Sequence, residues 1–176
     1  MKKAVFLDRD GVINEVKTKR VTFVNRPDQF YFLEGAIEAI KLLTDSDFQI
    51  FVVTNQGGVG LGYLSHEQLQ SIHDHMLREI TRAGGFIQEV SCCTHKPHEG
   101  CGCRKPEAGM LLALAKKHDI DIAQSYMVGD REVDIEAGRK AGCTTVLLSD
   151  SPSHLYDADH MFTNLMEAAE FILKHK

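Results

Sequence analysis

Short apolar runs alternate with amphipathic stretches along the N-terminal half of the chain. The run over 4–7 ends at Asp8, and a second run over 49–53 ends at Thr54. Continuous apolar runs of this length are typical of strands that are buried on both faces. Between them, residues 35–43 carry apolar side chains at helical spacing, which predicts a helix.

The same alternation continues to the end of the sequence. Ser65 and Gln68 match a capping box, so a helix is expected to begin there and to end near Gly84. Pro106 suits the first turn of a later helix. The remaining expected elements are strands over 86–93, 125–128, 144–148 and 158–162, a helix over 132–141, and a last helix from 164.

Strands that alternate with helices predict an α/β fold with a central parallel sheet covered on both faces. The length of 176 residues suits one domain over 1–176. Ligands of such sheets bind beyond the carboxyl ends of the strands. Asp8, Thr54, a Cys/His segment over 92–104 and Asp130 each follow a predicted strand, so we expect them to converge at one edge.

Composition narrows the function classes. The formal net charge of -5 argues against a nucleic-acid partner, which usually meets a basic face. The one basic cluster, 17–20, is expected to be a solvated loop or a contact for a phosphorylated substrate. The apolar run after the basic N-terminus is too short for a signal peptide, and no stretch approaches a membrane span. A cytoplasmic protein is therefore predicted, and its size is consistent with a monomer.

Two acids stand two residues apart at the end of the first strand, as Asp8 and Asp10. Carboxylates held this close repel each other unless a cation or a proton lies between them. Mg²⁺ fits, since it prefers oxygen ligands and often bridges carboxylate and phosphate. The alternative is an ordinary turn at Asp-Arg-Asp-Gly.

Three further polar segments have weaker signals when taken singly. Thr54, Asn55 and Gln56 can donate to phosphoryl oxygens, although such residues are also common in turns. The pair Arg104 and Lys105 can neutralise a transferring phosphoryl group, or can be a surface basic pair. Asp130 follows a strand, and Asp134 lies one helical turn later on the same face. Asp134 either belongs to the same site or is a first-turn acid that favours the helix dipole.

Together and in this order, these motifs resemble the haloacid dehalogenase-type phosphohydrolases, over the chain to about residue 150. The resemblance implies a three-layer, Rossmann-like fold and hydrolysis through an aspartyl-phosphate. It implies that Asp8 is the nucleophile and Asp10 the general acid and base, with Thr54 binding the phosphoryl group and Lys105 offsetting its charge. It also implies that Mg²⁺ is bound by Asp130, the Asp8 carboxylate and the Asp10 main-chain carbonyl. Asp134 is a further ligand or a partner of the ligands.

The Cys/His segment has the pattern C-x-H-x5-C-x-C. Three thiols and one imidazole suit a tetrahedral zinc site with no vacancy for water, hence a structural one. The predicted ligands are Cys93, His95, Cys101 and Cys103. Cys92 points to the opposite face of the strand and is predicted to be core. His98 is an alternative ligand, and Cys143 is predicted to be a buried thiol.

A zinc loop followed by Cys-Arg-Lys-Pro is similar to the subgroup that holds the D-glycero-D-manno-heptose 1,7-bisphosphate 7-phosphatases and the histidinol-phosphate phosphatases. Members lack a large cap domain. The segments 106–112 and 125–130 favour removal of the 7-phosphate of the heptose bisphosphate, whereas the basic segment 17–20 departs from a Gly-Tyr-Val stretch expected there. In a heptose enzyme, Arg104 and Arg131 would be candidates to hold the distal part of the sugar phosphate; the alternative is that both are surface residues.

Other function classes compete with this hypothesis. The glycine-rich segment 57–62 follows a strand but lacks the G-x-G-x-x-G spacing of a dinucleotide-binding module. A non-catalytic zinc module would not need Asp8, Asp10 and Asp130 together. A phosphatase for nucleic-acid ends or another small sugar phosphate is a further alternative, and the acidic balance disfavours the former.

Overall fold

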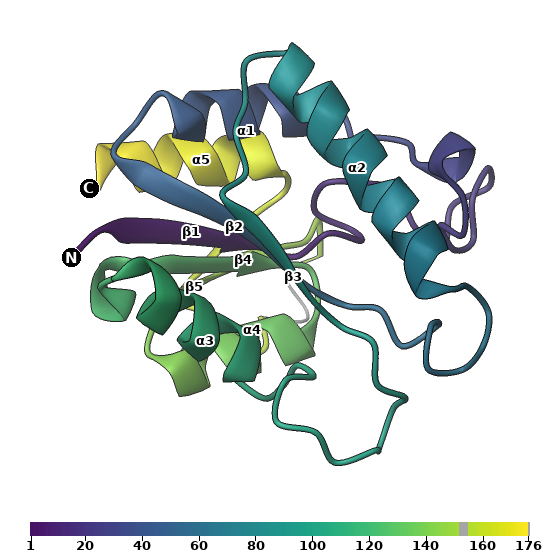
Figure 1. The fold of residues 1–176 in the computed structure, drawn as a ribbon. Helices are drawn as coiled ribbons and strands as arrows, with labels where there is room; N and C mark the ends of the chain where they lie inside the picture. Colours follow the sequence, from purple (N-terminus) through teal and green to yellow (C-terminus); the bar gives the residue numbers. More distant parts are fainter. Residues whose placement is uncertain (152–154, 176) are drawn as a thin grey trace.

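A computed structural model describes residues 1–151 and 155–175 of the chain. Within them, all strands form one parallel sheet in the order β3-β2-β1-β4-β5-β6 (Figure 1). The strands are β1 (Lys3–Leu7), β2 (Phe48–Asn55), β3 (Glu89–Cys93), β4 (Tyr126–Gly129), β5 (Thr144–Leu148) and β6 (His160–Phe162).

Helices cover both faces of the sheet, so the predicted three-layer α/β fold is confirmed. In Figure 1, α1, α2 and α5 lie on one face, and α3 and α4 lie on the other. The α-helices are α1 (Ala36–Thr44), α2 (His66–Arg82), α3 (Gly109–His118), α4 (Glu132–Ala141) and α5 (Leu165–Lys174). Short 3₁₀ turns lie at Pro27–Gln29 and Ile122–Gln124.

The apolar runs of the central strands supply two separate cores. In β1, Val5 and Leu7 belong to the core under α1, α2 and α5, whereas Ala4 and Phe6 belong to the core under α3 and α4. Successive side chains of a strand point to opposite faces, so a strand covered on both faces needs apolar residues throughout. That requirement explains the uninterrupted run before Asp8.

The strand order reverses direction at β1. From β1 the chain adds β2 and β3 on one side, then returns to add β4, β5 and β6 on the other. Leu7 pairs with both Val52 and Val128; β4 continues one residue beyond this level, to Gly129, and β2 three residues beyond it, to Asn55. Residues directly after these strands therefore meet where doubly wound sheets bind their ligands.

Several predicted boundaries were wrong. The helix placed at Pro106 begins at Gly109, because the Glu107 N–H donates to the Arg104 carbonyl and the Gly109 N–H to the Gly102 carbonyl, which holds the segment around Pro106 in turns. The strand predicted over 86–93 begins at Glu89, since the Phe86 N–H donates to Thr44 Oγ1 instead. The strand predicted over 158–162 begins at residue 160.

Other expectations are confirmed. The capping box at the start of α2 is present, with Ser65 Oγ accepting from the Gln68 N–H. Helix α4 spans the predicted residues and ends at Gly142, which has a positive φ of 96°. None of the helices in the described part of the chain has the length and apolar character needed to span a membrane.

Candidate functional site

Three carboxylates from separate segments meet at the carboxyl edge of the sheet. Asp8 follows β1, Asp130 follows β4, and Asp134 lies in the first turn of α4; their oxygen atoms approach within 4.8 Å of one another. Gly11 permits this, since a Cβ there would lie 2.0 Å from Asp130 Oδ2, and its φ is 85°. The predicted convergence of the first and fourth motifs is therefore present.

Lys105 lies between these acids and is buried. Its Nζ donates to Asp8 Oδ1 at 2.8 Å, to Asp134 Oδ1 at 2.6 Å and to the Val53 carbonyl at 2.8 Å. Burial by itself lowers the pKa of Lys105, but the two carboxylates outweigh it and raise the pKa above its usual value. All three ammonium protons are used, so Lys105 acts on a ligand through its charge.

Asn55 fixes the backbone that delivers this lysine. Its Nδ2 donates to the Lys105 carbonyl and its Oδ1 accepts from the Lys105 N–H, both at 2.9 Å. Asn55 also lines the cavity above the acids. The sequence predicted a substrate contact for this residue, whereas its amide is occupied by Lys105.

The acids exceed the positive charge that the protein places among them. Burial and the neighbouring Asp134 raise the pKa of Asp8 well above its usual value, and the same two causes raise the pKa of Asp130 to about 6. Asp130 Oδ1 is buried without a hydrogen-bond partner. A divalent cation would pair that oxygen and relieve the repulsion, so this donor set fits Mg²⁺.

Asp134 has its own partners within the protein. Its Oδ1 accepts from Lys105, and its Oδ2 accepts from the backbone N–H groups of Asp130 at 3.2 Å and Arg131 at 3.1 Å. Both oxygens are engaged in holding the start of α4 and the lysine. This pattern suits a residue that supports the ligands.

Asp10 is held by a separate set of donors. Its Oδ1 accepts from Arg9 Nε at 3.1 Å, from Arg9 Nη2 at 2.8 Å and from Asn14 Nδ2 at 2.9 Å, while its Oδ2 accepts from Gln56 Nε2 at 3.2 Å. Burial acts to raise the pKa of Asp10, but the Arg9 guanidinium and these hydrogen bonds lower it below its usual value.

Gln56 joins the second motif to the first. Its Nε2 also donates to Thr54 Oγ1 at 2.9 Å. Thr54 lies near the carboxyl end of β2 and is buried, with 1% of its surface exposed. The structure thus brings Thr54, Gln56 and Asp10 together as the sequence predicted.

A cavity of about 770 Å³ opens above the acids. Asp8, Asp10 and Asp130 lie in its wall, together with the predicted substrate contacts Arg104 and Arg131. Lys17 of the basic segment also lines this wall. Arg20 of the same segment instead forms an ion pair with Glu15 and lies over the ring of Tyr31.

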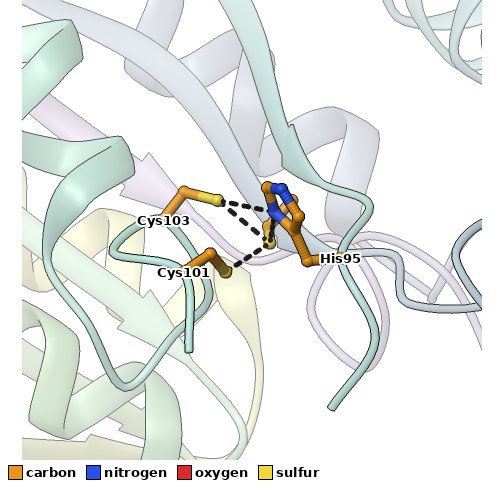
Figure 2. A group of neighbouring side chains, drawn as sticks. His95, Cys101 and Cys103 are labelled. Carbon is orange, nitrogen blue, oxygen red and sulfur yellow. Dashed lines mark hydrogen bonds between the residues drawn. The ribbon is translucent and has the colours of Figure 1, made fainter. Parts of the chain in front are cut away.

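The four predicted zinc ligands also meet. Cys93 Sγ lies 3.3 Å from His95 Nδ1, 3.6 Å from Cys101 Sγ and 3.1 Å from Cys103 Sγ. Figure 2 shows the His95 ring and the thiols of Cys101 and Cys103 pointing toward one another. All four donor atoms lie within 4.8 Å of each other, and three thiols with one imidazole are a donor set typical of structural zinc.

The remaining cysteines and His98 lie outside this cluster. Cys143 is buried as predicted, and burial raises the pKa of its thiol to about 12. The prediction that Cys92 is core was wrong: β3 is the edge strand of the sheet, and the Cys92 side chain is exposed there. His98 is exposed and does not belong to the four-donor group.

Sequence reasoning missed three residues of the site. Arg9, Asn14 and His73 are buried, and Arg9 Nη1 lies 3.1 Å from His73 Nε2. The sequence signal available for Arg9 was its position between Asp8 and Asp10, two acids to which its guanidinium could donate. No pattern in the sequence linked His73, which lies 64 residues away, to that arginine.

Comparisons with known proteins agree with this site. A family model described as HAD-hydrolase-like matches residues 102–168. The D-glycero-beta-D-manno-heptose-1,7-bisphosphate 7-phosphatase of Bordetella bronchiseptica is 38% identical over 146 residues, which is 83% of this chain and 80% of that protein. The D-glycero-alpha-D-manno-heptose-1,7-bisphosphate 7-phosphatase of Campylobacter jejuni is 36% identical, over 96% of this chain and 95% of that protein.

Among solved structures, a D,D-heptose 1,7-bisphosphate phosphatase from B. bronchiseptica, complexed with magnesium and phosphate, superposes with a TM-score of 0.88. It is 33% identical, and 99% of each chain is covered. Near full-length similarity at this level, together with the acid edge and the Cys₃His loop, identifies the family. This chain is a phosphatase that belongs to the D-glycero-D-manno-heptose-1,7-bisphosphate 7-phosphatase family of haloacid dehalogenase-like hydrolases.

Proposed function

We propose that this protein removes the 7-phosphate of D-glycero-D-manno-heptose 1,7-bisphosphate in a magnesium-dependent reaction. The observation that carries the proposal is the cluster of buried Asp8 and Lys105 with half-buried Asp130 beneath a cavity large enough for a sugar bisphosphate. Two relatives that match most of the chain bear this activity in their names. The reaction belongs to cytoplasmic sugar metabolism, and one domain over 1–176 carries it out.

Asp8 is the nucleophile in this proposal. Its Oδ1 is held by Lys105, which leaves Oδ2 to attack phosphorus from the cavity. A bond forms between Asp8 and phosphorus while the bond to the sugar oxygen breaks. The positive charge of Lys105 offsets the charge of the transferring group, and Thr54 and Gln56 complete the polar floor beneath it.

Asp10 is the general acid and base. Asp10 gives a proton to the departing sugar oxygen, then takes one from the water that attacks the aspartyl-phosphate. Inorganic phosphate leaves, and the Asp8 carboxylate is restored. A carboxylate that serves both steps needs a fixed orientation, and its four hydrogen bonds supply one.

Mg²⁺ would be held by the Asp8 carboxylate, the Asp10 main-chain carbonyl and Asp130, with Asp134 as their supporting partner. Bound there, the ion would neutralise charge on the phosphoryl oxygens. Zn²⁺ would be held by Cys93, His95, Cys101 and Cys103, and its role is to stiffen the loop before Arg104.

The distal end of the substrate meets the two arginines on the cavity wall. Arg104 and Arg131 can each grip phosphate oxygens in a bidentate way. Asn55, whose amide is used by the Lys105 backbone, positions that lysine. Lys17 adds a third positive charge at the same wall.

Phosphate release in the presence of Mg²⁺ tests the proposal. Both anomers of the heptose 1,7-bisphosphate are compared with histidinol phosphate, using Asp8→Asn as the blank. We expect kcat/KM to be largest for one heptose anomer. A larger kcat/KM for histidinol phosphate would overturn the substrate assignment and keep the chemistry, and turnover by Asp8→Asn at the unmodified level would overturn the nucleophile.

A further inference from the structure

Arg9 is a buried arginine within the catalytic loop. Only 1% of its surface is exposed, and it follows the proposed nucleophile directly. Its guanidinium lies 6.0 Å from the ring centre of Phe30, so one of its faces is covered by an apolar group. A buried guanidinium is costly unless its N–H groups find partners, so the identity of those partners carries information.

The two edges of this guanidinium have different partners. Nε and Nη2 form a fork on Asp10 Oδ1, and Nη1 lies 3.1 Å from His73 Nε2. An arginine can only donate, so Nε2 is the acceptor in this contact and the imidazole proton is on Nδ1. Burial, followed by the charge of Arg9, lowers the pKa of His73 to about 4, which keeps the ring neutral and able to accept.

The hydrogen bonds distinguish the two oxygens of Asp10. Oδ1 receives three donors, two from Arg9 and one from Asn14, whereas Oδ2 receives one from Gln56. An oxygen with three donors has little capacity left to carry a proton. The oxygen left to exchange protons with the leaving group and with water is therefore Oδ2.

We propose that His73, acting through Arg9, is a positioning residue that fixes the rotation of the Asp10 carboxylate and so assigns proton transfer to Oδ2. The inference rests on the proposed function and adds a residue of α2 to its machinery. His73 is 4% exposed and does not line the cavity, so it acts through Arg9 and touches no substrate.

A pair of variants separates the acceptor from the bulk of the ring. His73→Phe fills the space but cannot accept from Arg9, whereas His73→Gln offers an amide oxygen. The readout is kcat/KM on two substrates, which reports the first step. The heptose bisphosphate releases an alkoxide that needs a proton, while p-nitrophenyl phosphate releases a phenolate that leaves without one.

We expect His73→Phe to lower kcat/KM for the sugar phosphate by about 10- to 100-fold, a part of the usual contribution of a general acid. The loss on p-nitrophenyl phosphate should be about threefold or less, and His73→Gln should recover most of the activity on the sugar phosphate. Should His73→Phe fail to fold, His73→Asn replaces it, because its shorter amide stops short of Arg9.

Equal losses on the two substrates would show that His73 only supports the fold, and would overturn the inference while leaving the phosphatase intact. Unchanged kcat/KM for the sugar phosphate in a folded variant would overturn it as well. An unmodified protein that hydrolyses neither phosphate would instead overturn the proposed function itself, so the two failures are distinguishable.

Discussion

Two polar clusters lie at the same edge of the sheet, and the protein holds them in different ways. In the carboxylate cluster, Asp8 and Asp134 are buried and share a cation of the protein's own, since Lys105 donates to both. The Cys/His cluster begins at Cys93, the last residue of β3, and its other three members lie in the long connection to α3; Cys93 is buried and His95 is exposed. Its thiols and imidazole contact one another.

The carboxylate cluster is positioned by the fold itself, whereas the Cys/His cluster is expected to be positioned by a bound metal ion. Asp8 and Asp130 are fixed by the paired strands β1 and β4 that they follow and by hydrogen bonds within the protein, so the acid edge should persist without Mg²⁺. The loop carrying Cys101 and Cys103 has fewer fixed points and gains them when four donors share an ion. Loss of Mg²⁺ should therefore leave the acid edge in place, whereas loss of Zn²⁺ should loosen the loop.

The largest expected effect is at the nucleophile. Asp8→Asn keeps the shape and the acceptor for Lys105 but removes the attacking oxygen anion, so turnover should fall by at least about 10³-fold while the fold persists. Phosphate release measures the loss of turnover, and thermal unfolding measures whether the fold persists. Asp45→Asn, a change in an exposed surface pair with Lys41, is the matched control and should retain activity.

Next in size is removal of the protein's own cation. Lys105→Met leaves Asp8 and Asp134 buried without their shared partner, so we expect activity to fall by about 10²-fold or more. Without added metal, the free energy of unfolding should drop by about 3 kcal/mol or more.

Denaturant unfolding with EDTA, then with Mg²⁺, checks this expectation. Lys140→Met is the control, because Lys140 pairs with two glutamates at the surface. A Lys105→Met protein as stable as the unmodified one would mean that the acid edge does not depend on its own cation.

At the loop, Cys101→Ser should lower zinc content and reduce kcat/KM by about tenfold, because Lys105 and Arg104 follow directly on a looser segment. Metal analysis and proteolysis of the loop measure the effect. Cys92→Ser is the matched control, since this exposed neighbour of Cys93 lies outside the cluster and should keep the zinc. Unchanged zinc in Cys101→Ser would refute the ligand set.

The contrast between the clusters also explains what the sequence could predict. The apolar strand runs, the polar residues that follow them and the spacing of the four cysteine and histidine ligands are local patterns, and they led to the correct sheet and the correct clusters. Cys92 was misplaced because alternation along a strand does not reveal that β3 lies at the edge of the sheet.

Other errors arose from long-range contacts. Pro106 looked like a helix start, but the bond from the Gly109 N–H to Gly102 begins the helix later. The pairing of Arg9 with His73 joins a loop to a helix 64 residues away, and such pairing leaves no local signal. The bonds from the Asn55 side chain to the Lys105 backbone, 50 residues on, likewise had no local signal, and the predicted substrate contact of Asn55 stays a prediction.

The smallest expected effect tests whether the two regions act separately on the substrate. Arg104 follows the zinc loop, whereas Arg131 precedes α4 and its N–H donates to Asp134, within the acid edge. Arg104→Gln and Arg131→Gln should each raise KM by about fivefold with kcat little changed, since each removes one contact at the cavity wall.

The effects of these two variants should diverge when the loop is loosened. In the Cys101→Ser background, Arg104 is already misplaced, so Arg104→Gln should add little, whereas the KM effect of Arg131→Gln should be retained in full. Steady-state kinetics of the three single and two double variants, beside the unmodified protein, give the two coupling energies. Equal losses from Arg104→Gln in both backgrounds would mean that the loop is not what positions this arginine, and the distinction between a folded acid edge and a metal-ordered loop would then not extend to substrate binding.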